Sequence, residues 1–425
     1  MSQFRLARIT LLLAAIGLNF APGLSQAADK PAAAAEAPKG DTVRQEMFKL
    51  IDPAQVKTLM DAKNYAEVLS RINQAEALAD KTPYETFVLH RLRIALASVT
   101  GDNAMAMASL EAIIDSGNLP VADRGDFIQA LANYHYNAKD YPKAITWFMR
   151  YQKETGDLNK VRPYIIRAYY FGNDMEKAKQ ELLSDLRANQ QAGKQPAIEE
   201  LQLLANTGAK TKDKTTYLIA LEQLVKFYPT DDYWTDLLSR TQSKDGYSTR
   251  FQLDVFRLEY AAVKVMAPEE YTEMAELALL ATFPTEAKKV LDAGFAAGVL
   301  GTGTQAAKHK KLRDQAAKGA ADDQKNIGSG EAGAAKSKDG TGLVNLGYAY
   351  VTMDQFDKGI ELIQKGIAKG GLKRPDDAKL RLGYSYAMAG RKDDAIKTLE
   401  TVQGNDGLGD LARYWLLWIN RPTGK

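Results

Sequence analysis

Apolar residues recur at helical spacing along most of the chain, and from Asp41 onward the pattern breaks about every 15 to 20 residues. This period predicts amphipathic helices, because residues three and four positions apart lie on the same face of a helix. The breaks carry turn residues such as Lys139-Asp140-Tyr141 and Ala389-Gly390-Arg391. Gly readily ends a helix and Asp can cap the next one, so the pattern predicts helix, short turn and helix throughout.

The stretch from Leu343 to Val402 contains one pattern twice, at a spacing of 36 residues. In each copy a large residue precedes Gly, an aromatic residue follows three positions on, and a small and a large residue come later on the next helix. The two copies are Leu346, Gly347, Tyr350, Gly359 and Ile363, and Leu382, Gly383, Tyr386, Ala395 and Leu399. A repeat of this length indicates stacked helical units.

The small residue on the second helix can be followed toward the N-terminus. Its positions are Val68, Ala106, Ala144, Ala178, Tyr217, Ala287, Gly359 and Ala395. These segments resemble tetratricopeptide repeats, helical hairpins of about 34 residues with this arrangement of small and aromatic residues. The resemblance implies an all-α fold, an α-solenoid of antiparallel helix hairpins forming a right-handed superhelix. Tyr217 departs from the pattern, and the two longest intervals each leave room for a degenerate hairpin.

The first residues have the pattern of an export signal. Arg5 and Arg8 precede a short apolar run, and Ser25-Gln26-Ala27 places small residues where a signal peptidase reads. We therefore expect residues 1–27 to be a signal peptide cleaved after Ala27, which predicts a periplasmic or secreted protein. An uncleaved membrane anchor is the alternative, although the apolar run is shorter than the ~20 residues that span a bilayer.

Composition shifts divide the remaining chain. Residues 28–41 are an Ala/Pro-rich flexible linker, and residues 42–300 form an N-terminal repeat superhelix. Residues 301–342 read as a polar helix followed by a Gly-rich mobile loop from Asn326 to Gly342. Residues 343–425 form a C-terminal pair of repeats with a capping helix, on which Trp415, Leu416 and Trp418 cover the last apolar face.

Composition and motifs argue against several classes of function. The chain has no cysteine, which excludes disulfides, thiolate metal sites and a cysteine nucleophile. Removal of Arg5 and Arg8 with the signal peptide lowers the formal net charge of the chain by two from +3. Gly328 to Gly333 match a dinucleotide-binding fingerprint, but no strand precedes them. His90, His135 and His309 lie far apart, and His135 takes a packing position. We expect no enzyme activity, cofactor or metal.

Aromatic residues are dense from Tyr134 to Phe171, which makes this segment the candidate binding region. The resemblance implies that part of each first helix faces a concave groove that binds partners. Its groove positions are Asn133, Tyr136, Asn137, Arg167, Tyr170 and Phe171, with Tyr348 and Tyr384 in the C-terminal pair. Tyr, Arg and Asn suit peptide recognition. The competing interpretation is that these aromatic residues only pack hairpin on hairpin.

These observations favour a non-catalytic periplasmic scaffold or adaptor that binds another cell-envelope protein through its concave groove. A component of an envelope polysaccharide export or synthesis machine is the alternative, because tyrosine rings also stack on sugars. A peptidoglycan-acting enzyme is a further alternative, but it needs a catalytic domain that the sequence does not reveal. Nothing in the charge pattern points to nucleic acid.

Overall fold

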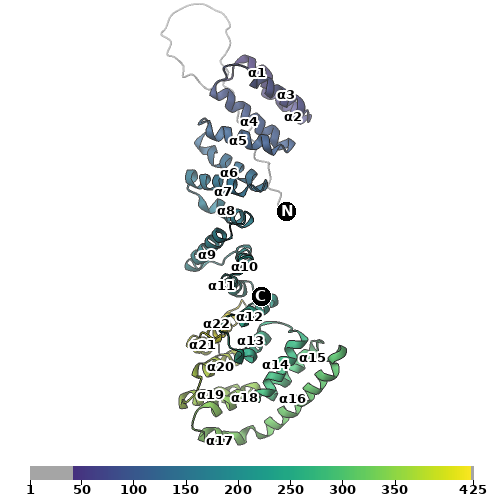
Figure 1. Ribbon diagram of the computed structural model, residues 1–425, viewed down its shortest axis with the longest axis vertical. Helices are drawn as coiled ribbons and strands as arrows, with labels where there is room; N and C mark the ends of the chain where they lie inside the picture. Colours follow the sequence, from purple (N-terminus) through teal and green to yellow (C-terminus); the bar gives the residue numbers. More distant parts are fainter. Residues whose placement is uncertain (1–41, 423–425) are drawn as a thin grey trace, which may run out of the picture. The chain divides into compact units, whose positions relative to one another are not determined.

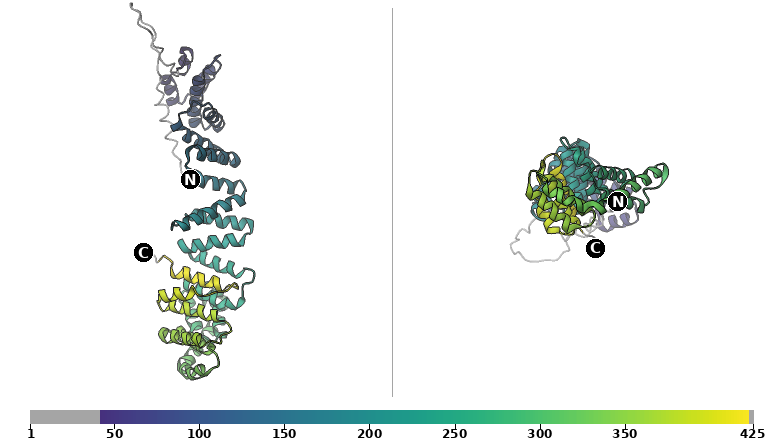
Figure 2. Two further views of the ribbon diagram at one scale, coloured as in Figure 1. Left: turned by 90° about the vertical axis from the view of Figure 1, so that its left-hand side faces the viewer. Right: turned by 90° about the horizontal axis from the view of Figure 1, so that it is seen from below.

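The computed structural model describes residues 42–422 and shows an all-α protein (Figure 1). No strand occurs among these residues, and successive helices pack side by side in antiparallel pairs (Figure 2). The chain divides into two compact units between Ala178 and Lys179, within helix α9 (Met175–Gln191). The all-α hairpin architecture expected from the periodicity is thereby confirmed. The signal peptide and the linker to residue 41 lie outside the described residues.

The first unit consists of helices that pair with their neighbours in sequence. They are α1 (Gln45–Ile51), α2 (Pro53–Asp61), α3 (Tyr65–Glu76), α4 (Pro83–Thr100), α5 (Asn103–Asp115), α6 (Val121–Asn137), α7 (Tyr141–Thr155) and α8 (Leu158–Phe171). The predicted break at Lys139-Asp140-Tyr141 separates α6 from α7, and Asn64, Asp102 and Asp140 cap the first turns of α3, α5 and α7. Each side chain accepts a hydrogen bond from the backbone N–H three residues on, at 3.4, 2.9 and 3.2 Å.

Small residues stand where paired helices approach most closely. Ala106, Ala144 and Ala178 have no exposed surface, which confirms the alignment of the small position in this unit. Tyr217 in the second unit departs from that pattern for a visible reason. Its partner helix supplies the small residue instead, since a Cβ on Gly208 would lie 2.7 Å from the Tyr217 backbone nitrogen.

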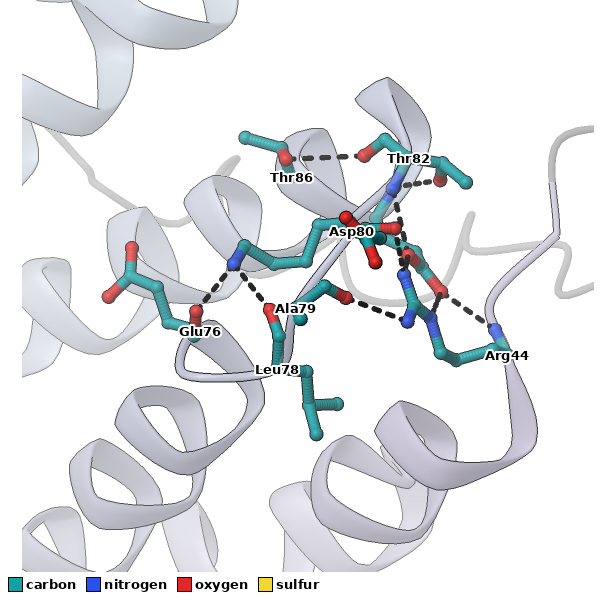
Figure 3. A network of polar contacts seen from close by, with 9 residues as sticks. Arg44, Glu76, Leu78, Ala79, Asp80, Thr82 and Thr86 are labelled. Carbon is teal, nitrogen blue, oxygen red and sulfur yellow. Dashed lines mark hydrogen bonds and ion pairs between the residues drawn. The ribbon is translucent and has the colours of Figure 1, made fainter.

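An ion pair between Arg44 and Glu85 stabilises the N-terminal end of the first unit (Figure 3). The Arg44 guanidinium donates to Glu85 at 2.9 and 2.8 Å and to the Ala79 carbonyl at 2.9 Å. Glu85 is 1% exposed and also accepts from the Thr82 N–H, completing a capping box at α4. Hydrogen bonding to Arg44 lowers the pKa of Glu85 to about 2.

The second unit holds the remaining helices of the described chain. They are α10 (Ile198–Thr211), α11 (Lys214–Phe227), α12 (Asp231–Gln242), α13 (Gln252–Ala262), α14 (Pro268–Leu280), α15 (Pro284–Ala296), α16 (Ala306–Asn326), α17 (Glu331–Lys336), α18 (Thr341–Thr352), α19 (Phe356–Lys369), α20 (Pro375–Met388), α21 (Lys392–Leu399) and α22 (Leu408–Ile419). Short 3₁₀ helices are η3 (Thr249–Phe251), η4 (Gly303–Gln305) and η5 (Ile327–Gly330). The pair α12 and α13 fills the first long interval, where a degenerate hairpin was expected.

The structure of the Gly-rich segment differs from the one predicted from the sequence. Residues 326–342 were expected to be a mobile loop, but η5 and α17 occupy most of this stretch. Ile327 and Ala334 pack with Leu346 against a buried cluster, and Glu331 pairs with Lys358. A few apolar anchors and one ion pair therefore order a segment whose composition resembles a linker.

The helices α18 and α19 cross closely enough to require glycine on both sides. A Cβ on Gly347 would lie 2.6 Å from the Gly359 carbonyl oxygen, and a Cβ on Gly359 would lie equally close to the Gly347 oxygen. Neither position can accept a side chain without moving the backbone apart. The duplicated pattern at residues 343–402 therefore encodes two close helix crossings, the second of which packs Gly383 against Leu399.

Helix α22 joins distant parts of the second unit (Figure 1). It packs on α20 and α21, as expected of a capping helix, and also on α11 and α13. Trp415 is 1% exposed, and the Trp418 indole N–H donates to the Ala261 carbonyl at 2.7 Å. Residues 179–422 thus belong to one compact unit, in which α22 links helices that precede residue 300 with helices that follow residue 342. Within the described chain, no helix is long and apolar enough to cross a bilayer.

Candidate partner-binding surface

Four aromatic rings from three helices lie in contact in the first unit. Tyr136 from α6 contacts Tyr141 at the start of α7, with ring centroids 5.6 Å apart, and Tyr164 on α8 at 6.2 Å. Tyr141 in turn stacks on Phe171 at the end of α8, at 6.0 Å. All four rings are at least partly accessible, and Phe171 is 55% exposed. We refer to Tyr136, Tyr141, Tyr164 and Phe171 as the aromatic surface.

Buried rings hold the aromatic surface in place from beneath. Phe148, which has no exposed surface, stacks on Tyr164 with centroids 5.5 Å apart. Tyr170 is 9% exposed and packs edge-on against Phe171 at 5.3 Å. Such ring pairs add packing energy beyond the area they bury, so these contacts help to fix the orientation of the accessible rings.

Polar groups border the aromatic surface. Asn133 is partly buried on α6, whereas Asn137 on α6 and Arg167 on α8 are exposed. Burial raises the pKa of the Tyr136 hydroxyl, an effect that the positive charge of Arg167 partly offsets. The phenol therefore stays protonated at neutral pH and can donate or accept a hydrogen bond. Rings, amides and a guanidinium together form a surface suited to an extended peptide backbone.

The structure places five of the six predicted residues of this region around one surface. Asn133, Tyr136 and Asn137 share a face of α6, and Arg167 and Phe171 share a face of α8, because helical neighbours recur at three and four positions. Tyr170 is the exception. It is buried and supports Phe171 rather than reaching solvent.

Two residues of the aromatic surface escaped the sequence analysis as binding candidates. Tyr164 stands three positions before Arg167 and seven before Phe171, so the helical spacing could have identified it. Tyr141 carried no comparable signal, because it stands in a predicted turn and begins α7. It joins Tyr136 to Phe171 only because α7 packs between α6 and α8.

The predicted groove positions in the C-terminal pair are corrected by the structure. Tyr348 is 1% exposed and Tyr384 is 0% exposed, so neither lies on an open surface. Their rings contact each other edge-on at 5.6 Å, and Tyr384 stacks on Trp415 at 5.4 Å. The physical reason is that α22 covers the face of α20 that carries Tyr384.

A buried ion pair lies beside these two tyrosines. Arg257 on α13 is 5% exposed and binds both carboxylate oxygens of Glu286 at 2.8 Å, and Asp254 at 2.8 Å. The Tyr348 hydroxyl donates to Glu286 at 2.7 Å, and the Arg257 guanidinium lies 4.5 Å from the Tyr348 ring centroid. We call Arg257, Glu286, Asp254, Tyr348 and Tyr384 the buried Arg–Tyr cluster. The sequence did not identify Arg257 as part of a cluster, because this residue lies in no recognisable motif.

The other singled-out residues have structural roles. His135 is 8% exposed, which confirms its packing position, and burial lowers the pKa of its imidazole. His309 is buried and its Nδ1 accepts from the Gly301 N–H at 3.2 Å. Gly328 and Gly330 lie in η5 rather than in a turn between a strand and a helix. Across residues 42–422, no cluster of three potential ligands could hold a metal ion.

Part of the chain is similar to proteins of a known family. A tetratricopeptide repeat family model matches residues 344–409. A comparison with curated protein sequences gave no significant match. Solved structures that resemble the chain include the TPR2AB domain of yeast Sti1 in complex with pHSP90, which is 15% identical. That match covers 70% of this chain and 98% of the other chain, with a TM-score of 0.23.

Two further solved structures show the same degree of likeness. Yeast Tom70 is 13% identical over 88% of this chain and 94% of its own, with a TM-score of 0.23. The TPR domain of P58(IPK) is 13% identical over 88% and 97%, with a TM-score of 0.22. At these values the neighbours carry no inference about function. The segment that the family model matches contains the two duplicated hairpins, α18 with α19 and α20 with α21, and residues 344–409 are therefore tetratricopeptide repeats.

Proposed function

We propose that this protein is a non-catalytic scaffold that binds another protein of the cell envelope through the aromatic surface of α6, α7 and α8. The observation that carries the proposal is a pre-packed set of four accessible rings, of which Phe171 is the most exposed, with Arg167 and Asn137 at its border. Tetratricopeptide repeats are protein-interaction modules, and contiguous exposed aromatic surface marks interaction sites.

The chemistry of the surface favours a peptide segment as the ligand. Aromatic and Arg side chains supply most of the binding energy at protein interfaces, where a few of them dominate. Tyr136 and Phe171 are already fixed by ring contacts, so binding orders few additional side chains. The exposed amide of Asn137 can pair with a backbone carbonyl or N–H of an extended segment.

The location of the scaffold rests on its first 27 residues. The positive residues, apolar run and small residues of that segment support export and cleavage after Ala27. Expression in a bacterial host followed by N-terminal sequencing of the periplasmic fraction tests this. A mature chain beginning at Ala28 is expected, and a chain that retains Met1 in the membrane fraction would show an anchor instead.

Site-specific photocrosslinking tests the binding surface in the intact protein. A benzoylphenylalanine placed at Phe171 should give a discrete protein adduct in cells. The same residue at Val121, which is 88% exposed on α6 of the same unit, is the matched control and should give none. Equal labelling at both positions would remove the aromatic surface as the site, and an adduct that is glycan would favour the polysaccharide alternative.

Substitutions then measure how much the surface contributes to affinity. For the partner captured at Phe171, Phe171→Ser and Arg167→Glu should each weaken binding by ~10-fold or more, as expected for hot-spot residues. Lys49→Glu makes the same charge change on an exposed residue of α1 and serves as the control for long-range electrostatics. If Lys49→Glu weakens binding as much as Arg167→Glu, the effect comes from net charge and not from this surface.

A further inference from the structure

A group of exposed cations lies on two adjoining loops of the second unit. One loop connects α17 to α18, and the other connects α19 to α20. The side chains of these cations lie on the loops or at the helix ends that lead into them. We call the following five exposed residues the basic patch: Lys336, Lys338, Lys369, Lys373 and Arg374.

Hydrogen bonds hold the two loops against each other. The Lys369 ammonium donates to the Ala335 carbonyl at 2.6 Å, and the Gly340 N–H donates to the Gly370 carbonyl at 2.9 Å. Each bond joins one loop to the other. The cations of the two loops are therefore neighbours in space and form one surface.

The carboxylates nearest to the basic patch in sequence already have partners. Asp339 accepts from the Thr341 N–H at 2.8 Å, and this hydrogen bonding, followed by the charges of Lys369 and Lys373, lowers its pKa. The other carboxylates form ion pairs outside the patch, which are Glu331 with Lys358, Glu361 with Lys365, Asp376 with Lys379 and Asp377 with Arg250. The basic patch therefore keeps an excess of positive charge.

The cations of the basic patch are open to a ligand. Lys369 donates to a backbone carbonyl, and no carboxylate of the described chain forms an ion pair with the other four. Like charges held close together repel each other, so the approach of negative charge is favourable. Each exposed ion pair contributes little, which means that a tight ligand must meet several of these cations at once. A chain of closely spaced negative charges fits this requirement better than a single anion.

Two observations favour a protein segment over a lipid surface as the source of those charges. Peripheral membrane binding usually combines positive charge with apolar side chains that enter the bilayer. The exposed large apolar side chains of the described chain all lie outside residues 327–375. In addition, the loop between α19 and α20 joins the two hairpins that match the tetratricopeptide repeat model.

We propose that the basic patch binds an acidic segment of a protein, with several Asp or Glu residues in a short extended stretch. Successive residues of an extended chain lie about 3.3 Å apart, so such a segment can present carboxylates to both loops. This surface goes beyond the aromatic surface of the first unit and does not depend on it. The scaffold then has a second place at which to hold a protein.

Two labelled peptides test the proposal on the full mature chain. One consists of about eight glutamates that alternate with glycine, and the other replaces each glutamate with glutamine. Fluorescence anisotropy should show binding of the glutamate peptide and none of the glutamine peptide. The affinity should fall by ~10-fold or more as NaCl is raised from about 20 to about 200 mM, because salt screens exposed charges.

Charge reversal locates the site. The variant Lys336→Glu/Lys338→Glu/Lys373→Glu/Arg374→Glu should bind the glutamate peptide at least ~10-fold more weakly, because four attractions become repulsions. The matched control makes the same change in net charge at four other exposed lysines of the second unit that form no ion pair with a described residue. It is Lys194→Glu/Lys264→Glu/Lys392→Glu/Lys397→Glu, and it should change the affinity by less than about 3-fold.

A milder variant keeps the test valid if the charge reversal prevents folding. Glutamine at the same four positions removes the charges without introducing repulsion and should weaken binding by ~3-fold or more. Lys369 stays unchanged in both variants, because its ammonium holds the two loops together. Melting curves of all variants show whether the fold is retained.

Four results would overturn the proposal. The glutamate peptide does not bind at low salt with the protein at millimolar concentration, or the control variant loses as much affinity as the patch variant. Vesicles of equal parts phosphatidylglycerol and phosphatidylcholine displace the peptide at a lower concentration of accessible negative charge than unlabelled peptide does, which assigns the patch to a lipid surface. Alginate does so instead, which assigns it to an acidic glycan. Crosslinking at Phe171 is unaffected by each of these outcomes, so the two binding surfaces are tested separately.

Discussion

The aromatic surface of the first unit and the buried Arg–Tyr cluster of the second use the same residue types in opposite environments. Phe171 is 55% exposed, whereas Tyr384 is fully buried although its position was expected on a groove. The difference comes from covering helices, since α22 closes over Tyr384 and no described side chain buries Phe171. A tyrosine or phenylalanine on a repeat helix is therefore a binding residue only where nothing returns to cover it.

The two regions also differ in the surroundings of their arginine side chains. Arg167 is exposed beside its aromatic rings, and water solvates its charge. Arg257 is buried among its rings and must be matched by Glu286 and Asp254, because an unpaired buried charge is strongly unfavourable. The charge of Arg167 is thus open to solvent, whereas the charge of Arg257 is matched inside the second unit.

Removing the covering helix should have the largest effect on this contrast. Deletion of residues 410–425 takes away Leu411, Tyr414 and Trp415, each at most 1% exposed, and exposes Tyr384. Burial of one such side chain contributes about 1.5–3 kcal/mol, so we expect the melting temperature to fall by more than ~10 °C. Calorimetry on this variant and on a control lacking only residues 423–425 measures the change. An unchanged melt would refute the closing role of α22.

Breaking the buried ion pair should have the second-largest effect on stability. Arg257→Leu leaves Glu286 and Asp254 uncompensated and should destabilise the protein by about 3–5 kcal/mol in denaturant unfolding. The double variant Arg257→Leu/Glu286→Leu should be less destabilised than the single one, because one unpaired charge is removed. Arg167→Leu in the open region is the matched control, with an expected change within about 0.5 kcal/mol. Equal losses from Arg257→Leu and Arg167→Leu would contradict the comparison.

The pH dependence of stability should differ in sign between the units. Burial raises the pKa of Glu259 on α13 to about 7, while Thr235 donates to it at 3.3 Å. The folded chain then binds more protons than the unfolded chain between about pH 4.5 and 7, so stability falls as pH rises through this window and is level above it. Glu259→Gln should therefore gain about 1–2 kcal/mol at pH 8 and little at pH 4.5.

Glu85 in the first unit should make stability depend on pH in the opposite direction. Its pKa is lowered to about 2, so the stability it contributes is present above pH ~4.5 and is lost as pH falls toward ~2. Glu85→Gln should remove that acid-side loss, and Glu259→Gln should leave it intact. Unfolding curves from pH 2 to 8 for the two variants test both pH dependences. A stability of the Glu259→Gln protein that still falls from pH 5 to 7 as in the wild type would contradict the assignment.

Single rings give the smallest effects. Tyr384→Phe removes a hydroxyl that contacts Arg257 at 3.2 Å and Asp254 at 3.4 Å, and should cost about 0.5–1.5 kcal/mol. Phe171→Ser, at an exposed position, should change the unfolding free energy by at most about 0.5 kcal/mol while abolishing partner capture. A loss of stability from Phe171→Ser larger than that from Tyr384→Phe would mean that Phe171 is a packing residue.

The turns and helix starts were predictable because their causes are local. The predicted breaks at Lys139-Asp140-Tyr141 and Ala389-Gly390-Arg391 both fall where one helix ends and the next begins, and Asp140 caps α7 through a contact three residues away. The close helix crossings at Gly347 and Gly359 were predictable for a related reason. Paired helices are neighbours in sequence, so a small residue that recurs with the repeat marks the point of contact.

The aromatic surface was predictable only in part. The residues that share one face of α6 or α8 follow from the helical period, which places Asn133 near Tyr136 and Arg167 near Phe171. The period does not show which of two adjacent residues is covered, so Tyr170 was expected in the groove and is buried. Nor does it show that Tyr141, at the start of another helix, completes the surface.

The sequence by itself therefore determined the helices, their turns and the repeat family, because each depends on residues close along the chain. Only the tertiary structure decided that residues 179–422 form one unit and that Tyr348 and Tyr384 lie inside it. Those outcomes depend on contacts between distant residues, such as the Tyr414 and Thr241 hydroxyls, which lie 2.9 Å apart across 173 positions of sequence. No local pattern encodes such a contact, since burial is fixed by whichever helix returns to cover a face.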